Sequence, residues 1–352
     1  MSKQENRPDI LLVDFITMSG FDVADKLDIP AIVSYPNVSP YQQSGMRTPT
    51  SFTGHGMEMS WFDRLINDLV FRIKPLFLYP GSRYVNQLRS ERQLNPLERG
   101  IEQYYSERQL FCYNSFAFDY PQLIHPLIQY TGPLQVSTTT QIPRIPLDET
   151  LASWLDDLER RNQQVLYVST GTTGLLNNEV VRLYYTAFED VLQLKSNLYI
   201  LWQLPEEFNS ILPYLVHDRI RIMSSLDQPQ VLEHNAVKAF FSHCGINSVY
   251  ESILAEKPLL ALPFRHDQKD NAARVEDAAI GVRLDRFLPN IKAHHITKGI
   301  QEVLEEKAYL DSIKHLKQII SKEGGAVRAV HLIEQTLAVG YEHLQPTAFY
   351  TP

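Results

Sequence analysis

The stretch with the most chemically useful side chains lies between residues 238 and 271 and reads KAFFSHCGINSVYESILAEKPLLALPFRHDQKDN. The polar turn His243-Cys244-Gly245 follows one apolar run and leads into a helical pattern, and His266-Asp267-Gln268 follows the next apolar run. This order predicts strand, turn, helix, strand and polar loop. Because the carboxyl ends of neighbouring parallel strands face one crevice, we expect both polar loops to line a single site.

The tip of the predicted helix is suited to hold an anion. Asn247 and Ser248 lie in its first turn, where unpaired N–H groups and the helix dipole attract a phosphate. His243 could donate a hydrogen bond or a charge to the same group. Glu251 lies one turn deeper on the same face, roughly 5.4 Å away, where it would meet whatever is joined to the phosphate, such as a ribose. The alternative is a capping box, in which Ser248 and Glu251 only satisfy helix-end amides.

Two further features are predicted at the same edge of the sheet. The loop 169–174, STGTTG, follows a strand, and its small residues would let backbone N–H groups approach an anion. Steric closure of the strand explains this composition equally well. Asp267 and Gln268 together can accept and donate hydrogen bonds to the hydroxyl groups of a sugar. Such a pair is also common in solvated loops.

The composition is that of a globular protein. The chain has 352 residues, more than one domain usually needs, with 44% hydrophobic and 21% charged residues. A net charge of -8 provides no basic field, so we expect no nucleic-acid partner. Cys112 and Cys244 form no metal-ligand pattern and favour a reducing compartment. No apolar run reaches the roughly 18 residues that span a bilayer, and the polar start is not a signal peptide, so we expect a soluble, cytoplasmic chain.

The first part of the chain predicts a partial N-terminal α/β domain at 1–133, followed by a proline-containing linker at 134–150. Asp14 stands where the first strand ends. The expected strands cover 10–13, 31–34, 111–114 and 128–131, and the expected helices cover 58–73 and 95–108.

The second part predicts a complete domain at 151–340 and a tail at 341–352. Strand and helix patterns alternate regularly, which is typical of a Rossmann-like parallel sheet. The expected fold is therefore α/β, with a complete C-terminal domain and a partial N-terminal one. No G-x-G-x-x-G follows a strand, which argues against a nicotinamide dehydrogenase.

Residues 225–271 resemble the donor-binding signature of the UDP-dependent glycosyltransferases of the GT-B class. The matching positions keep the family spacing and are Gln228, His234, F-F-S-H-C-G-x-N-S at 240–248, Glu251-Ser252, Pro258, Pro263, Asp267-Gln268 and Asn271. The resemblance implies a GT-B-like fold and a UDP-sugar that serves as substrate, with no cofactor and no metal. It also implies transfer of a hexose, with glucose as the first choice and glucuronic acid as an alternative, to a small lipophilic or hydroxylated acceptor with inversion.

The resemblance also implies a role for each matching side chain. His243 would contact the diphosphate, and Asn247 and Ser248 would hold the phosphate nearer the nucleoside. Glu251 would bind the ribose hydroxyls, and Asp267 and Gln268 would bind the sugar hydroxyls. Gln228 would lie near the nucleoside, and Thr172 would contact the phosphates.

Four features depart from the family pattern. Asp14 matches the acid that orients a catalytic histidine, and on this resemblance we expect this chain to lack the first part of the amino domain, which carries that histidine. This favours a truncated transferase or, alternatively, a non-catalytic nucleotide-sugar-binding subunit whose partner chain supplies the missing part. Ser225 replaces a tryptophan that stacks on uracil, and Glu256 replaces a helix-ending glycine, which costs about 1 kcal/mol if φ is positive. Arg328-Ala329-Val330 and His343-Leu344 resemble the segment before the membrane anchor of animal-type relatives, and we expect no anchor in this chain.

Overall fold

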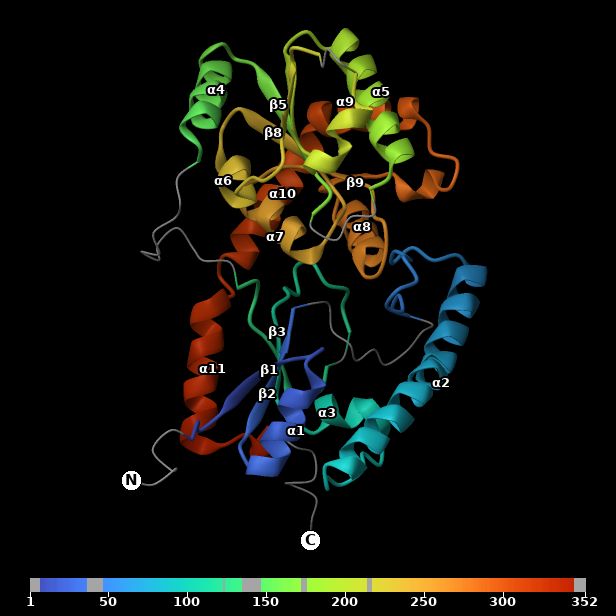
Figure 1. The fold of residues 1–352 in the computed structure, drawn as a ribbon, viewed down its shortest axis with the longest axis vertical. Coiled ribbons are helices and arrows are strands. Elements are labelled where there is room, and N and C mark those ends of the chain that lie inside the picture. The colour runs from blue at the N-terminus through green and yellow to red at the C-terminus, as the bar shows by residue number, and fades with distance from the viewer. Residues whose placement is uncertain are drawn as a thin grey trace. The chain divides into compact units, whose positions relative to one another are not determined.

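The protein forms two compact units (Figure 1). The structure is a computed structural model that describes residues 7–36, 47–122, 124–134, 147–171, 176–213 and 217–344. The first unit contains Met1–Thr50, Met59–Val136 and Lys322–Pro352, and the second contains Ser51–Glu58 and Ser137–Ser321. Each unit therefore contains segments that are far apart in the sequence.

The second unit is built on a parallel sheet of six strands in the order β10-β9-β8-β5-β6-β7. The strands are β5 (Gln164–Ser169), β6 (Leu198–Gln203), β7 (Ile220–Met223), β8 (Val237–Ser242), β9 (Leu259–Ala261) and β10 (Gly281–Arg283). The helices are α4 (Glu149–Arg160), α5 (Asn178–Leu194), α6 (Gln228–Glu233), α7 (Ile246–Leu254), α8 (Gln268–Asp277), α9 (Ala293–Glu305) and α10 (Lys307–Ile320). Short 3-10 helices cover Glu206–Ile211 and Asp285–Phe287.

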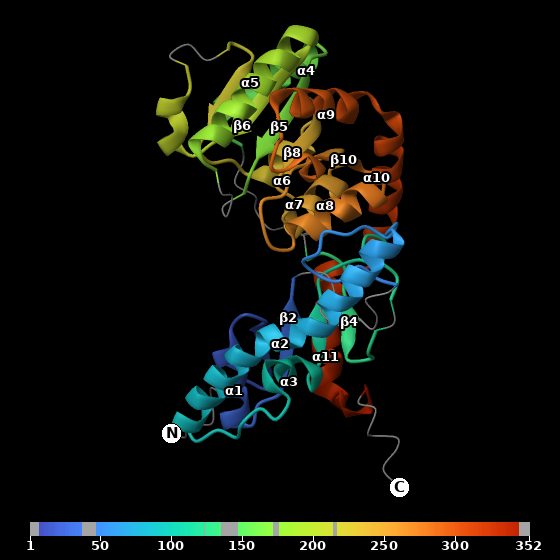
Figure 2. The same cartoon turned by 90° about the vertical axis from the view of Figure 1, so that its right-hand side faces the viewer.

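Helices cover both faces of this sheet (Figure 2). On one face, α5 and α9 enclose an apolar core that contains Phe188, Trp202 and Phe241. On the other face, α6, α7 and α8 pack against β8 and β9. Strands that are buried on both sides are expected to be apolar, as residues 165–168 of β5 and 239–241 of β8 are. The buried Ser169 and Ser242 stand where these two strands end.

The first unit is built on a parallel sheet in the order β1-β2-β3-β4. Its elements are β1 (Leu11–Asp14), α1 (Met18–Leu27), β2 (Ala31–Tyr35), α2 (Trp61–Glu91), a 3-10 turn at Gly100–Glu102, α3 (Gln103–Ser106), β3 (Leu110–Cys112), β4 (Ile128–Tyr130), α11 (Gly325–Val339) and a 3-10 turn at Glu342–Leu344. Phe21 and Ala24 of α1 pack on one face of the sheet. Ala329 of α11 packs on the other face, against Ile32 and Phe111.

The predicted fold class is confirmed, and three predicted boundaries differ from the structure. The helix predicted at 58–73 continues as α2 to Glu91, and the helix predicted at 95–108 is a short 3-10 turn followed by α3. The predicted C-terminal domain at 151–340 ends earlier, because the chain from Lys322 onward belongs to the first unit. The apolar stripe of α11 packs on the first sheet, and the stripe alone does not specify which sheet covers it.

Candidate functional site

Three loops leave the second sheet at one edge. Ser169 at the end of β5 is in register with Ser242 at the end of β8, and Ser242 is in register with Ala261 at the end of β9. The strands are parallel, so the loops that follow them start side by side. The three polar loops that the sequence predicts at one crevice therefore do begin at one edge.

His243 is the centre of this edge. Its side chain is only 7% exposed and is held between two glycines, since a Cβ atom at either Gly171 or Gly245 would collide with the imidazole ring. Burial lowers the pKa of His243, and the Ser169 carbonyl and the Asp267 charge act in the opposite direction. The ring is therefore neutral at pH 7 and has one donor and one acceptor nitrogen.

The Nδ1 atom of His243 is buried and has no hydrogen-bond partner among the described residues. A buried polar atom without a partner costs about 1–3 kcal/mol, and such atoms are rare in folded proteins. A ligand that supplies the missing partner would recover this cost. The buried ring at the end of β8 therefore marks this edge of the sheet as a candidate site.

The helix α7 begins directly after His243. Its N-cap residue is Gly245, and no side chain caps the helix. The helix dipole favours negative charge at this end of the helix. Asn247 is exposed in this turn, and Ser248 is buried. The predicted anion seat thus has the local geometry that such a site needs.

Glu251 and Ser248 are joined by Gln228, the first residue of α6. Nε2 of Gln228 donates to Oε2 of Glu251 at 2.6 Å and to Oγ of Ser248 at 2.9 Å. Burial raises the pKa of Glu251, and the hydrogen bond from Gln228 opposes this shift. The capping-box alternative is wrong, because α7 begins at Ile246 and Ser248 is its third residue, not its cap.

The third loop leads into α8. Nδ2 of Asn271 donates to the carbonyl of Cys244 at 3.0 Å and to Oδ2 of Asp267 at 2.9 Å, which joins this loop to the His243 turn. Oε1 of Gln268 accepts from the N–H groups of Phe264 and Arg265 at 2.9 and 3.0 Å. The amide nitrogen of Gln268 is therefore the end suited to a ligand. Asn271 is a positioning residue that the sequence shows only as a match to the family signature.

Thr172, which the sequence also singled out, lies outside the described residues. Two other such residues lie elsewhere. Asp14 lies in the first unit at the end of β1, where it is exposed and Oδ1 accepts from the N–H group of Ile16 at 3.0 Å. Ser225 is exposed before α6.

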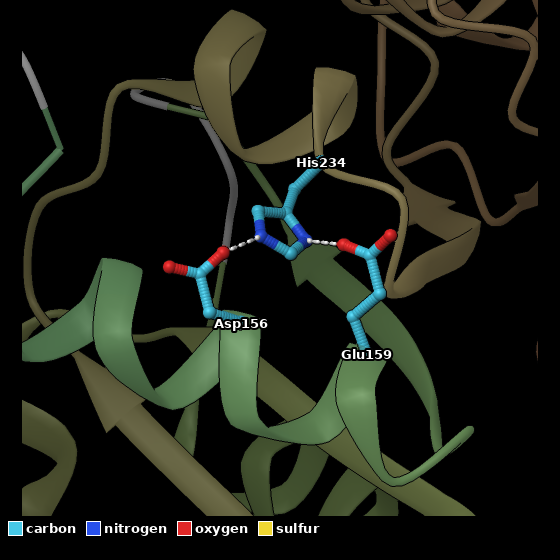
Figure 3. A group of neighbouring side chains, drawn as sticks. All are labelled: Asp156, Glu159 and His234. Carbon is cyan, nitrogen blue, oxygen red and sulfur yellow. Dashed lines mark hydrogen bonds and ion pairs between the residues drawn. The ribbon is translucent and has the colours of Figure 1, made fainter.

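A group of metal-ligand residues lies away from this edge. The ring of His234 sits between two carboxylates of α4, with Nε2 3.3 Å from Oδ1 of Asp156 and Nδ1 3.9 Å from Oε2 of Glu159 (Figure 3). Nδ1 also accepts from the N–H group of Ala236 at 3.1 Å. The two carboxylates face opposite ring nitrogens, so one ion cannot bind Nε2 and both acids without a rearrangement. We interpret the group as a structural tie between α4 and the end of α6.

No helix in the described part of the chain is both long and apolar enough to cross a membrane. The two cysteines, Cys112 and Cys244, are buried, and burial raises the pKa of both thiols. Neither thiol is therefore activated as a nucleophile.

Known proteins resemble this chain in sequence and in fold. The family described as UDP-glucoronosyl and UDP-glucosyl transferase matches residues 1–348. UDP-glucuronosyltransferase 3A1 of Homo sapiens is 26% identical over 380 residues, which cover 99% of this chain and 66% of the relative. UDP-glycosyltransferase 90A1 of Arabidopsis thaliana is 31% identical over 175 residues, which cover 47% of this chain and 36% of the relative. The chain thus covers less than two thirds of the length of these curated relatives.

Solved structures share the fold. The glycosyltransferase of kitacinnamycin superposes with a TM-score of 0.70 at 17% identity, covering 95% of this chain and 77% of that one. UDP-glucose: anthocyanidin 3-O-glucosyltransferase in complex with UDP has a TM-score of 0.64 at 20% identity, covering 94% and 75%. The GT-B-like fold expected from the sequence is confirmed.

Proposed function

The chain belongs to the UDP-glucoronosyl and UDP-glucosyl transferase family, and on that premise we propose that it moves a hexose from a UDP-sugar to an acceptor hydroxyl, with inversion at the anomeric carbon. The observation that carries the proposal is the N-terminus of α7, which no side chain caps and which follows directly after the buried His243. The helix dipole favours the negative charge of a diphosphate at such a helix end.

The donor would lie along the edge of the sheet in a fixed order. Glu251, oriented by Gln228, would accept hydrogen bonds from the ribose hydroxyls. His243, Asn247 and Ser248 would hold the two phosphates, and the family resemblance adds a phosphate contact from Thr172. Asp267 and the amide nitrogen of Gln268 would bind the sugar hydroxyls, and Asn271 would hold Asp267 in place. Gln228 would also lie near the nucleoside.

The reaction would be a direct displacement. The acceptor oxygen would attack the anomeric carbon while the bond from that carbon to the diphosphate breaks and UDP leaves. Negative charge would then develop on the diphosphate, where the first turn of α7 and His243 can stabilise it. The acceptor hydroxyl would lose its proton to a general base, the role that the family resemblance gives to a histidine paired with Asp14, and no histidine of this sequence is assigned to that role. No metal or cofactor enters this scheme. The acceptor would be a small lipophilic or hydroxylated molecule.

A second candidate is a non-catalytic nucleotide-sugar-binding protein that works with a partner chain. It is supported by the edge strand of the first unit, because among the described strands β1 pairs with β2 alone. Leu12 in β1 is 51% exposed and Ile16 just after it is 71% exposed. An open strand edge beside exposed apolar side chains is suited to receive a strand from another chain.

Calorimetry with UDP and with UDP-glucose tests the donor site. We expect the wild-type chain to bind UDP and Glu251→Ala to lose most of this affinity while keeping its melting temperature. Asp218→Ala, which removes an exposed carboxylate in the same unit, is the matched control and should bind normally. A wild-type chain that binds no UDP would refute both candidate functions.

Turnover separates the two candidates. Release of UDP from UDP-glucose in the presence of a panel of small hydroxylated acceptors supports the transferase. Tight UDP-glucose binding without release, with or without acceptors, supports the non-catalytic subunit. Repeating both assays with UDP-glucuronic acid identifies the sugar.

A further inference from the structure

A short segment from the amino-terminal half of the sequence is part of the second unit. This segment, Ser51–Glu58, is called the strap here. The residues on either side of it, Thr50 and Met59, belong to the first unit. The strap lies beside α8 (Figure 2), the helix that begins with the predicted sugar-binding residues.

Asp270 anchors the strap. Its carboxylate accepts from the N–H group of Phe52 at 2.5 Å through Oδ2 and from the N–H group of Gly54 at 2.7 Å through Oδ1. The residue is only 4% exposed. Burial raises its pKa, and the two backbone hydrogen bonds oppose that shift. A buried carboxylate is costly unless it is hydrogen-bonded, so the strap and Asp270 depend on each other.

Further contacts hold the strap along α8. The carboxylate of Asp277, the last residue of the helix, accepts from the N–H group of Met57 at 2.8 Å. Arg283 donates to the carbonyl of Gly54 at 2.9 Å and is itself paired with Asp285. Gly54 has φ +68, and a Cβ there would lie 3.1 Å from Cβ of Lys269. The strap is therefore closely fitted along the length of the helix.

The anchored turn of α8 is also the turn that carries the predicted sugar contacts. Asp270 follows Gln268 by two residues and Asp267 by three, and the charge of Asp267 is close enough to contribute to the raised pKa of Asp270. No side chain caps the start of α8. The position of this first turn thus depends on the contacts of Asp270 and of Asn271, which binds the carbonyl of Cys244.

We propose that the strap and Asp270 are positioning elements for the donor sugar: they fix the first turn of α8 so that Asp267 and Gln268 meet the sugar hydroxyls. This inference rests on the proposed function and adds residues that act without touching the substrate. It predicts a difference between the affinities for UDP and for the UDP-sugar. UDP lacks the hexose that Asp267 and Gln268 would bind, so loosening the strap weakens binding of the UDP-sugar and leaves binding of UDP unchanged.

Two variants loosen the contact from its two sides. Asp270→Asn keeps the shape but turns one acceptor into a donor that faces a backbone N–H group. Gly54→Ala strains the strap, because its φ is positive and its Cβ approaches Lys269. Glu276→Gln is the matched control, since this acid of α8 pairs with Arg286.

Calorimetry with UDP and with UDP-glucose provides the main readout. We expect Asp270→Asn and Gly54→Ala to bind UDP like the wild type and to bind UDP-glucose about tenfold more weakly, which corresponds to the loss of one or two hydrogen bonds. The control should keep the wild-type ratio of the two affinities. An unchanged ratio in both folded variants would overturn the proposal, as would an equal loss of UDP affinity.

Hydrogen exchange of the unliganded chain gives a second readout that needs no donor. We expect amides in residues 264–271 to exchange faster in Asp270→Asn than in the wild type and in Glu276→Gln. If Asp270→Asn is too unstable for calorimetry, hydrogen exchange of Gly54→Ala tests the proposal in its place. If the wild-type chain fails to bind UDP, the proposed function falls, and unchanged exchange at 264–271 would refute the positioning role separately.

Discussion

Glu256 occupies a backbone conformation that favours glycine. It follows α7 with φ +57, at the position where the family pattern has a helix-ending glycine. Its carboxylate accepts from Nζ of Lys317 at 2.8 Å, and this hydrogen bond with the surrounding lysine charges lowers its pKa. The positive φ costs about 1 kcal/mol, and a partly exposed ion pair offsets about 0–1 kcal/mol of it.

Replacing Glu256 with glycine should stabilise the chain once the ion pair is already absent. In a Lys317→Met background, we expect Glu256→Gly to raise the free energy of unfolding by about 1 kcal/mol, because only the backbone strain is then removed. Urea unfolding measures the effect. Glu256→Ala keeps the strained φ and should show no such gain; an equal gain in that variant would show that the backbone is not the cause.

At the scale of single residues, spacing predicted which side chains gather at the site but not what they bond to. Ser248 and Glu251 were expected on one helix, with His243 just before it, and they lie in α7 with His243 three residues before its first residue. The bond from Gln228 to Glu251 spans 23 positions, and helical spacing says nothing about a contact between two different helices. The burial that leaves Nδ1 of His243 without a partner depends on Gly171, which comes from another strand.

Among the elements, the loop after β5 is fitted against the end of β8. Gly171 in this loop has φ +66 and lies directly over the His243 ring. We expect Gly171→Ala to displace the imidazole and to weaken UDP-glucose binding by at least about tenfold, and positive φ alone should cost about 1–2 kcal/mol of stability. Calorimetry and urea unfolding measure the two effects.

The matched control for this loop is Gly100→Ala in the first unit, which has a similar φ of +69 and would contact Ser82. It should lose stability and keep donor affinity. Loss of donor affinity in the control would mean that strain anywhere in the chain, and not the His243 contact, weakens binding.

Elements with strong periodicity were predictable, and their partners were not. The strands β5, β6 and β8 are composed mainly of apolar residues, so the sequence indicated their positions. The apolar stripe of α11 fits either sheet on sequence grounds, and the helix packs on the first. The strap has no periodicity at all, so nothing in its sequence indicated that it would bind α8.

At the scale of the whole molecule, the donor should stabilise one unit. A UDP concentration of about one hundred times its Kd adds about 2.7 kcal/mol to the free energy of unfolding of the unit that binds it. Hydrogen exchange with and without UDP should therefore show added protection in β5, β8 and α7, and no added protection in β2, β3 and α11. If UDP protects α11 and the second unit from exchange but does not protect β2, the assignment of α11 to the first unit is contradicted.

The strap also limits how this chain can be divided or recombined. The chain passes from one unit to the other after residues 50, 58, 136 and 321. A hybrid protein with a single crossover near residue 137 would combine the strap of one parent with the α8 of another. The buried Asp270 of one parent would then face the strap backbone of the other parent. We expect functional chimeras only where residues 51–58 are inherited together with Asp270, Asp277 and Arg283. The two halves of the sequence are thus not independent units of inheritance, although each unit of the fold has its own sheet.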